Sequence, residues 1–252
     1  MRMTKKLHIF VVSLLSSYFV FAQNSTTSIQ EKTEVQVAIC ESESIVREKL
    51  GTDRWKLKRQ LQTRLVDTSE LELYNSGLVF RIRINTEKDK VEVALKKKVA
   101  DDYRSERYSA QLDCEFDQHQ QQRKRTCKMS YEITLHQWQS VLNEEHPLEL
   151  LSPSQLGWLQ ELNYILPNGL RMTDEISGPS YTQKTPQYEK MLDMTTDRRG
   201  IEYIEISAKV PTDLINTVEA DLLKELNEKN IQICDREMSR LTYRKLTSFF
   251  GF

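Results

Sequence analysis

Basic side chains recur at every second position in three short segments of the chain. They are Arg81 and Arg83, Lys96 and Lys98, and Lys56 and Lys58. Side chains two positions apart in a β-strand point to the same face, so each pair would share one. An arginine fork binds phosphate oxygens in pairs, and a lysine adds a compact positive charge. The spacing predicts charged sheet faces that could bind an anion, although a water-covered sheet face would show the same pattern.

β-strands must position these side chains, and the sequence predicts several. Residues 78–84 and 91–99 alternate apolar with polar residues on either side of a charged turn, which is typical of a β-hairpin. This hairpin would have one apolar and one charged face. Further strands are predicted at residues 35–39, 55–66, 108–116, 170–176, 188–194, 201–210 and 240–246.

Helical segments lie between the predicted strands. Apolar spacing predicts helices at residues 41–50 and 213–229 and a helical turn at 70–76. Thr134 and Ser152 each stand three residues before a glutamine and ahead of an apolar run, a capping-box pattern that would open two more helices. These helices should pack on the sheet, so the sequence predicts an α+β fold.

The amino terminus has the pattern of a secretory signal. Basic residues precede an apolar run at 9–21 that ends at a small-residue cleavage site. The run is shorter than a membrane-spanning helix and is interrupted by serines, so we expect no stable membrane anchor. We interpret 1–22 as a signal peptide, 23–33 as a polar leader and 34–252 as the folded domain. The protein would therefore be exported, and either periplasmic or secreted.

Cysteine usage agrees with an exported protein. Four cysteines remain after the signal, and an even number in an oxidising compartment favours disulfides over metal ligation. Cys114 and Cys127 bracket a polar segment at 118–125, and a bridge between them would close a short loop. Cys40 and Cys234 are then left for each other, which would tie the first strand to the end of the chain. Free buried cysteines are the other possibility.

Composition excludes some general functions. Lys and Arg number 36 against 37 for Asp and Glu, a near balance that gives no signal for nucleic-acid or anionic-membrane binding. We therefore expect no nucleic-acid partner. The histidines after the signal, His119, His136 and His146, have no nucleophile pattern nearby and are expected to be solvated or to cap helices. Any electrostatic function must then be local.

Three segments in order resemble the CYTH-like, or triphosphate tunnel, superfamily. Residues 65–73 are similar to its Tyr-Asp-Thr-Pro-like segment, 77–83 to its Leu-Arg-x-Arg strand and 93–96 to its Thr-Leu-Lys strand. Fainter similarities fall at 192–193, at 203–207 and at Ser239 to Tyr243. The region 118–180 has no matching motif.

The resemblance implies a fold and a site. The fold would be an antiparallel β-barrel that forms a tunnel, with several flanking helices. The site would bind a triphosphate or similar polyanion, and the residues implied to contact it are Arg81, Arg83, Lys96, Lys98, Lys56 and Lys58. Carboxylate and amide oxygens would hold one or two divalent cations, Mg²⁺ or Mn²⁺, and the candidate ligands are Glu34, Gln36, Glu92, Glu115 and Glu205.

The sequence departs from the family pattern at the metal site. The family's Glu-x-Glu-x-Lys strand is represented by Glu34, Gln36 and Ala38, and Ser207 stands at the second position of its Glu-x-Glu strand after Glu205. An amide oxygen binds a cation less strongly than a carboxylate, and alanine removes an ammonium group. We therefore favour an exported tunnel domain that binds a phosphate-rich or other polyanionic ligand through its basic residues. The alternatives are a divalent-metal-dependent triphosphatase or polyphosphatase, and a scaffold that kept only the fold.

Overall fold

A computed structural model describes residues 32–119, 122–144 and 146–234. The predicted signal peptide 1–22, the leader up to residue 31, the predicted strand 240–246 and the family-like segment Ser239 to Tyr243 lie outside this range. Within it, no helix has both the length and the apolar character to cross a membrane.

Ten strands and five α-helices make up the described part of the chain. The strands are β1 (Lys32–Ile39), β2 (Lys56–Asp67), β3 (Leu78–Asn85), β4 (Lys90–Val99), β5 (Asp113–His119), β6 (Gln122–Thr134), β7 (Arg171–Met172), β8 (Ile176–Lys184), β9 (Glu189–Asp197) and β10 (Glu202–Pro211). The helices are α1 (Glu43–Leu50), α2 (Glu72–Asn75), α3 (Leu135–Glu144), α4 (Pro153–Glu161) and α5 (Ile215–Glu228). Short 3-10 turns lie at Thr52–Arg54, Thr86–Lys88, Ser109–Gln111, Pro147–Leu150 and Thr212–Leu214.

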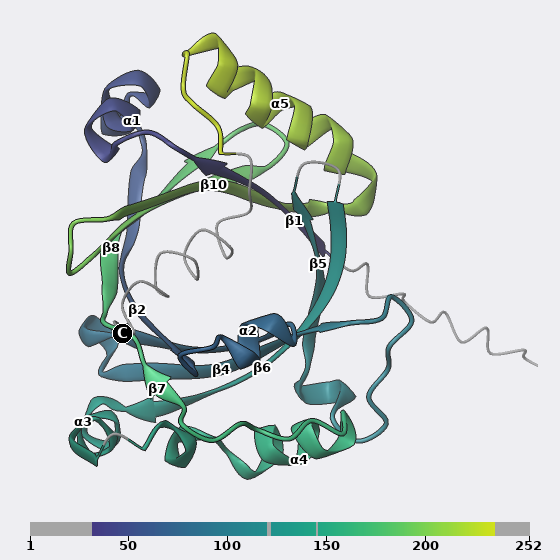
Figure 1. The fold of residues 1–252 in the computed structure, drawn as a ribbon. Coiled ribbons are helices and arrows are strands. Elements are labelled where there is room, and N and C mark those ends of the chain that lie inside the picture. Colours follow the sequence, from purple (N-terminus) through teal and green to yellow (C-terminus); the bar gives the residue numbers. More distant parts are fainter. Residues whose placement is uncertain (1–31, 120–121, 145, 235–252) are drawn as a thin grey trace, which may run out of the picture.

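The sheet closes on itself into a barrel. Its order is β3-β4-β6-β5-β1-β10-β9-β8-β2, and β2 pairs again with β3, so nine strands form a ring with the short β7 added beside β2. Figure 1 views this ring along its axis. The α+β barrel with flanking helices is thus confirmed. One neighbouring pair, β1 with β5, is parallel, so the barrel is mixed and not wholly antiparallel.

Helices cover the outside of the barrel in two groups, seen on opposite sides in Figure 1. On one side α5 and α1 bury Val218, Leu222 and Val46 against the apolar side chains of β1, β9 and β10. On the other side α3 and α4 bury Trp138 and Trp158 against the apolar face of the β3–β4 hairpin and β6. The outward residues of these strands are therefore mostly apolar, while the inward positions carry most of the polar residues and a smaller apolar cluster that includes Leu65, Val79 and Tyr203.

Local signals placed many of these elements correctly. The predicted hairpin is β3–β4, with Leu78, Phe80 and Ile82 fully buried. Helix α1 ends at Gly51, whose left-handed φ of 62° suits glycine. The capping box at Ser152 forms, with the Gln155 backbone nitrogen donating to the serine hydroxyl. At the start of α3, the Thr134 backbone nitrogen donates to the Gln137 side-chain oxygen, and the Gln137 backbone nitrogen donates to the Thr134 hydroxyl.

Two strand predictions were wrong in extent, and a segment predicted as a loop is mostly strand. Residues 108–111 form a turn, and β5 runs on to His119 past the predicted end at 116. The polar segment 118–125 belongs largely to β5 and β6, because its alternating residues pair across a hairpin. The segment 170–176 divides between the short β7 and the start of β8, a strand that we did not predict.

Both disulfides form as predicted. Cys114 and Cys127 are register partners across β5 and β6, 13 residues apart in sequence. Cys40 and Cys234, separated by 194 residues, join the end of β1 to the segment after α5. Backbone hydrogen bonds from Cys40 to Gln232 and from Cys234 to Ala38 accompany this second bridge. One disulfide thus links two neighbouring strands of the ring, and the other links β1 to the segment that follows α5.

Candidate functional site

The inner face of the barrel carries the charged residues. On β3 the even-numbered residues from Leu78 to Ile84 are buried toward α3 and α4, so Arg81 and Arg83 point into the ring. Register then assigns the inward residues of the neighbours. Arg83 is opposite Glu92 on β4 and Thr63 on β2, and Arg81 is opposite Leu65. The same alternation brings the polar residues of β1, β5, β6, β9 and β10 inward.

Three arginines gather on the wall formed by β2 and β3. Arg59 lies on β2, and Arg81 and Arg83 lie on β3. Burial, then repulsion by Arg83, lowers the pKa of Arg81 to about 10. Burial and the same neighbour lower the pKa of Arg59. The Nε atoms of all three are buried without a hydrogen-bond partner in the described part of the structure. Such donors are expensive to leave unpaired, so this wall is suited to receive acceptor oxygens.

Glu92 on β4 lies within ion-pair distance of Arg81. Its Oε1 atom lies 3.9 Å from Arg81 Nη2 and 3.7 Å from Lys128 Nζ, both beyond hydrogen-bond distance. Burial raises the pKa of Glu92, but Arg81 and Lys128 outweigh it and the pKa falls below its usual value. Glu92 therefore neutralises only part of the arginine charge.

The opposite wall, formed by β5, β1 and β10, carries carboxylates. Oxygens of Glu34, Glu115 and Asp117 lie within 4.8 Å of one another. Glu34 and Asp117 are register partners across the parallel β1–β5 pair. Burial, only partly offset by Lys209, raises the pKa of Glu34 above its usual range. The three side chains are close enough to hold a metal ion together.

Two lysines already lie among these carboxylates. Lys96 Nζ is 3.3 Å from Glu115 and 3.0 Å from Asp117, and Lys209 Nζ is 2.6 Å from Glu115 and 4.0 Å from Glu34. Burial lowers the pKa of Lys96, but Asp117 and Glu115 raise it by more than burial lowers it, so its pKa lies above the usual value. The two lysines in turn lower the pKa of Glu115 against the effect of burial. Lys96 and Lys209 are thus charged partners of this cluster.

The fit of a divalent cation to this cluster is mixed. Carboxylate oxygens are the donors that Mg²⁺ and Mn²⁺ prefer. However, both Glu115 oxygens accept from lysine, and the two Asp117 oxygens accept from Lys96 and from the Thr126 hydroxyl. A divalent ion would therefore enter beside two ammonium groups. The carboxylate ligands suit such a cation, but the two lysines already balance most of their negative charge.

A second acidic pair consists of Glu205 on β10 and Asp193 on the neighbouring strand β9. Glu205 faces Ala38 on β1 and Asp193 on β9. Asp193 accepts a hydrogen bond of 2.5 Å from the Ser180 hydroxyl. Burial, with Glu34 and Asp193 nearby, raises the pKa of Glu205 well above its usual range. Gln36 faces Ser207, so neutral side chains separate this pair from the Glu34 level.

The structure brings most, but not all, of the sequence-predicted site residues together. Those whose strand positions face the ring are Arg81, Arg83, Lys96, Glu34, Gln36, Glu92, Glu115 and Glu205. Lys98, Lys56 and Lys58 are exposed. Lys58 donates to the Met191 sulfur at 3.3 Å, and Lys98 lies near the end of β4 beside Gly77.

Sequence reasoning missed four charged residues of the inner face. Asp117 was missed because the predicted strand ended at 116, although it continues the alternation of Asp113 and Glu115. Lys209 continues the alternation of Glu205 in the same way. Arg59 was hidden by a β-bulge after Leu57, which breaks the simple alternation. Lys128 lies on β6, a strand that we did not predict.

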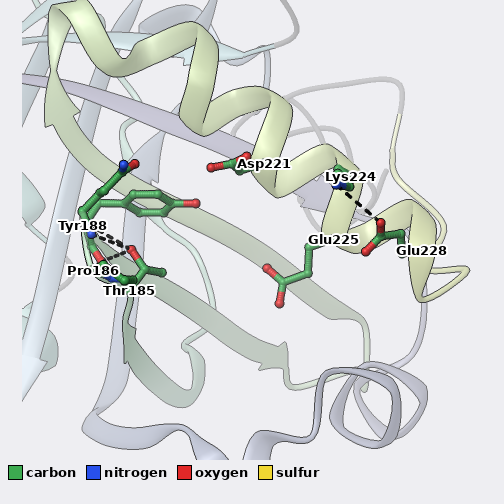
Figure 2. Close-up of a pocket in the computed structure, with 8 residues that line it drawn as sticks. Thr185, Pro186, Tyr188, Asp221, Lys224, Glu225 and Glu228 are labelled. Atoms are coloured by element: carbon green, nitrogen blue, oxygen red, sulfur yellow. Dashed lines mark hydrogen bonds and ion pairs between the residues drawn. The ribbon is translucent and has the colours of Figure 1, made fainter.

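A surface pocket lies outside the ring, between the β8–β9 turn and α5. Thr185 and Tyr188 line one side of it, and Figure 2 shows the Tyr188 ring pointing toward Asp221, with Glu225 and Glu228 farther along the helix. Lys224 lies 3.8 Å from Glu228 and partly offsets these charges. Burial, followed by Asp221 and Glu225, raises the pKa of Tyr188. The three carboxylates would repel a phosphate, so this pocket does not compete with the inner face as an anion site.

Two solved structures share the fold. A candidate adenylyl cyclase from Hippeastrum, HpAC1, described as having a dominant triphosphatase activity, superposes with a TM-score of 0.55 and 17% identity over 82% of this chain and 92% of that one. A candidate adenylate cyclase from Bacillus halodurans gives a TM-score of 0.55 and 15% identity over 82% and 95%. No protein-family model and no curated protein matches the sequence. The chain therefore shares the barrel fold of these two proteins, and a barrel is the fold that the resemblance to the CYTH-like superfamily implied.

Proposed function

We propose that this protein is an exported tunnel domain that binds a phosphate-rich polyanion inside its barrel. The observation that carries the proposal is the wall of Arg59, Arg81 and Arg83, with three buried Nε donors that lack partners within the described residues. Lys96 and Lys209 extend the positive charge, and Lys98, Lys56 and Lys58 would attract the anion from the exposed ends of their strands. The fold shared with a protein described as a triphosphatase supports the same ligand class.

Binding would relieve the electrostatic strain of the arginine wall. Burial, followed by repulsion from Arg83, lowers the pKa values of Arg59 and Arg81, so the charged guanidinium groups are disfavoured in the unliganded wall. A polyanion would supply charged acceptors to their Nε and Nη donors, each charge-assisted bond contributing about 1.5 to 3 kcal/mol. The carboxylate wall opposite would orient the anion toward β2 and β3 by repulsion. A chain of phosphates suits such a site better than a single carboxylate because it can contact several arginines at once.

A second candidate is a Mg²⁺- or Mn²⁺-dependent triphosphatase or polyphosphatase. The cluster of Glu34, Glu115 and Asp117 favours it, since these oxygens could hold a cation. A bound cation would supply charge neutralisation for the attack of water on a phosphoryl group. The neutral pair Gln36 and Ser207 removes two carboxylates from the family's pattern and counts against it. We therefore place binding first.

Export is supported by the two disulfides. Within the described residues there is no free cysteine, as expected for a chain that folds in an oxidising compartment. The proposed location is the periplasm or the exterior. Polyphosphate or a surface polyanion would be available there.

Thermal unfolding of the oxidised protein tests the proposal. Tripolyphosphate should raise the midpoint, because a ligand at a hundred times its Kd stabilises the native state by about 2.7 kcal/mol. Arg83→Gln should reduce this effect, whereas Arg54→Gln, which changes an exposed arginine in a turn, should not. Phosphate release, assayed on the same samples with Mg²⁺ or Mn²⁺, separates the two candidates. An unchanged midpoint in every sample would leave only a scaffold role.

A further inference from the structure

We propose that the tunnel binds its polyanion without a divalent metal, because Lys96 and Lys209 are built-in counter-cations of the carboxylate cluster. This inference rests on the proposed function and specifies how the site is neutralised. It departs from the divalent-metal chemistry that the resemblance implies.

The first argument is the occupation of the carboxylate oxygens. Glu115 accepts from Lys96 on Oε1 at 3.3 Å and from Lys209 on Oε2 at 2.6 Å. Asp117 accepts from Lys96 on Oδ1 at 3.0 Å and from the Thr126 hydroxyl on Oδ2 at 3.0 Å. All four oxygens of these two residues therefore have a donor. Metal ligation would need these charged contacts to break or to be shared with a second cation.

The second argument is position. Glu34 on β1 has two register partners, which are Lys209 on β10 and Asp117 on β5. The Glu34 level of the wall thus contains its own cation, supplied by the neighbouring strand. At the next level the partners are Gln36 and Ser207, which are neutral. The additional carboxylates of the family pattern are thus missing at the Gln36 level, and the carboxylates at the Glu34 level already have a lysine beside them.

The third argument is the reach of Lys96 toward an anion. An ammonium group has three donors, and Lys96 uses two on Glu115 and Asp117. Its side chain is 21% exposed and comes from β4, next to the arginine-bearing β3. One donor is left to contact a ligand held by Arg81 and Arg83. Lys96 could therefore bridge the carboxylate wall and the anion, which is the role that a divalent ion would otherwise have.

Two measurements on metal-stripped protein test this inference. Calorimetric titration of tripolyphosphate in EDTA should show binding, and Lys96→Met should weaken it by about tenfold to a hundredfold. Electron paramagnetic resonance of free Mn²⁺, without tripolyphosphate, should show no uptake by the wild type. The double variant Lys96→Met, Lys209→Gln should take up Mn²⁺, because its carboxylates have lost their partners. Lys184→Gln, an exposed lysine on β8, is the matched control and should behave as wild type.

The possible results separate this inference from the proposed function. Tripolyphosphate binding that requires Mn²⁺, or Mn²⁺ uptake by the wild type at one ion per chain, overturns the inference and leaves polyanion binding standing. A lack of tripolyphosphate binding with and without Mn²⁺ overturns the proposed function itself. The wild-type measurements do not depend on whether the double variant folds, and circular dichroism checks the variant separately.

Discussion

Replacing Arg81 with methionine should make the unliganded protein more stable. A pKa of about 10 lies between two and three units below that of a free guanidinium, and each unit corresponds to about 1.36 kcal/mol. The charged form of Arg81 is therefore disfavoured by about 3 kcal/mol in the folded state, and its side chain is 22% exposed, so little of this is screened. Methionine keeps the aliphatic contacts. Among the described residues, the ion pair that it loses is the 3.9 Å contact with Glu92.

The pH range of this effect follows from its sign. Arg81 is charged in the folded and the unfolded chain at pH 7, so the penalty is fully present there. Above pH 10 the folded state would lose the proton first, and stability would then rise with pH. Urea unfolding at pH 7 should show Arg81→Met more stable by about 1 to 3 kcal/mol, with tripolyphosphate binding weakened. Arg54→Met, at an exposed position, should change stability by less than about 0.5 kcal/mol. Destabilisation by Arg81→Met would refute the idea of an electrostatically strained arginine wall.

Two further predictions concern the opposite wall and the disulfides. The pKa of Glu205 is raised in the folded state. The contribution of its protonated carboxyl to folding stability is therefore fully present below the unfolded-state pKa, and it is lost as pH rises through the folded-state pKa. Glu205→Gln should therefore stabilise the protein at pH 8 more than at pH 5 in urea unfolding, and an equal change at both would contradict a buried carboxyl. Removing the 13-residue bridge with Cys114→Ala and Cys127→Ala should reduce stability by about 3 kcal/mol, measured by the shift of the denaturation midpoint. A shift equivalent to less than about 1 kcal/mol would show that the β5–β6 ladder alone holds this part of the wall.

Local patterns predicted the parts of the fold that depend on neighbouring residues. The β3–β4 hairpin and α5 have regular apolar spacing because each packs one face on a core. Both disulfides followed from the even number of cysteines and their flanking strands. The capping box at Ser152 was visible because it needs only residues three positions apart.

Closure of the ring could not be derived from local patterns. The parallel β1–β5 pair joins strands separated by more than 70 residues of sequence, and no residue type identifies such a partner. The resemblance to a barrel family supplied the closure. It could not supply the parallel direction of the β1–β5 pair, because the resemblance implied a wholly antiparallel barrel.

The site was only partly visible in the sequence for a related reason. Arg81 and Arg83 lie on a regular strand, so their shared face could be predicted. Arg59 follows a bulge, and its face depends on the register with Ser180 on β8. The pairing of Lys209 with Glu34 and Glu115 depends on three strands that are far apart in the chain. Residues that act across a barrel need its register before they can be grouped.

A crystal structure of the oxidised protein with tripolyphosphate, prepared without divalent metal, would test the central claim most directly. The account predicts phosphate density inside the ring, with oxygens at hydrogen-bond distance from the Nε or Nη atoms of Arg81 and Arg83. Phosphate bound only on the outer surface, or absent from the ring at saturating concentration, would contradict it.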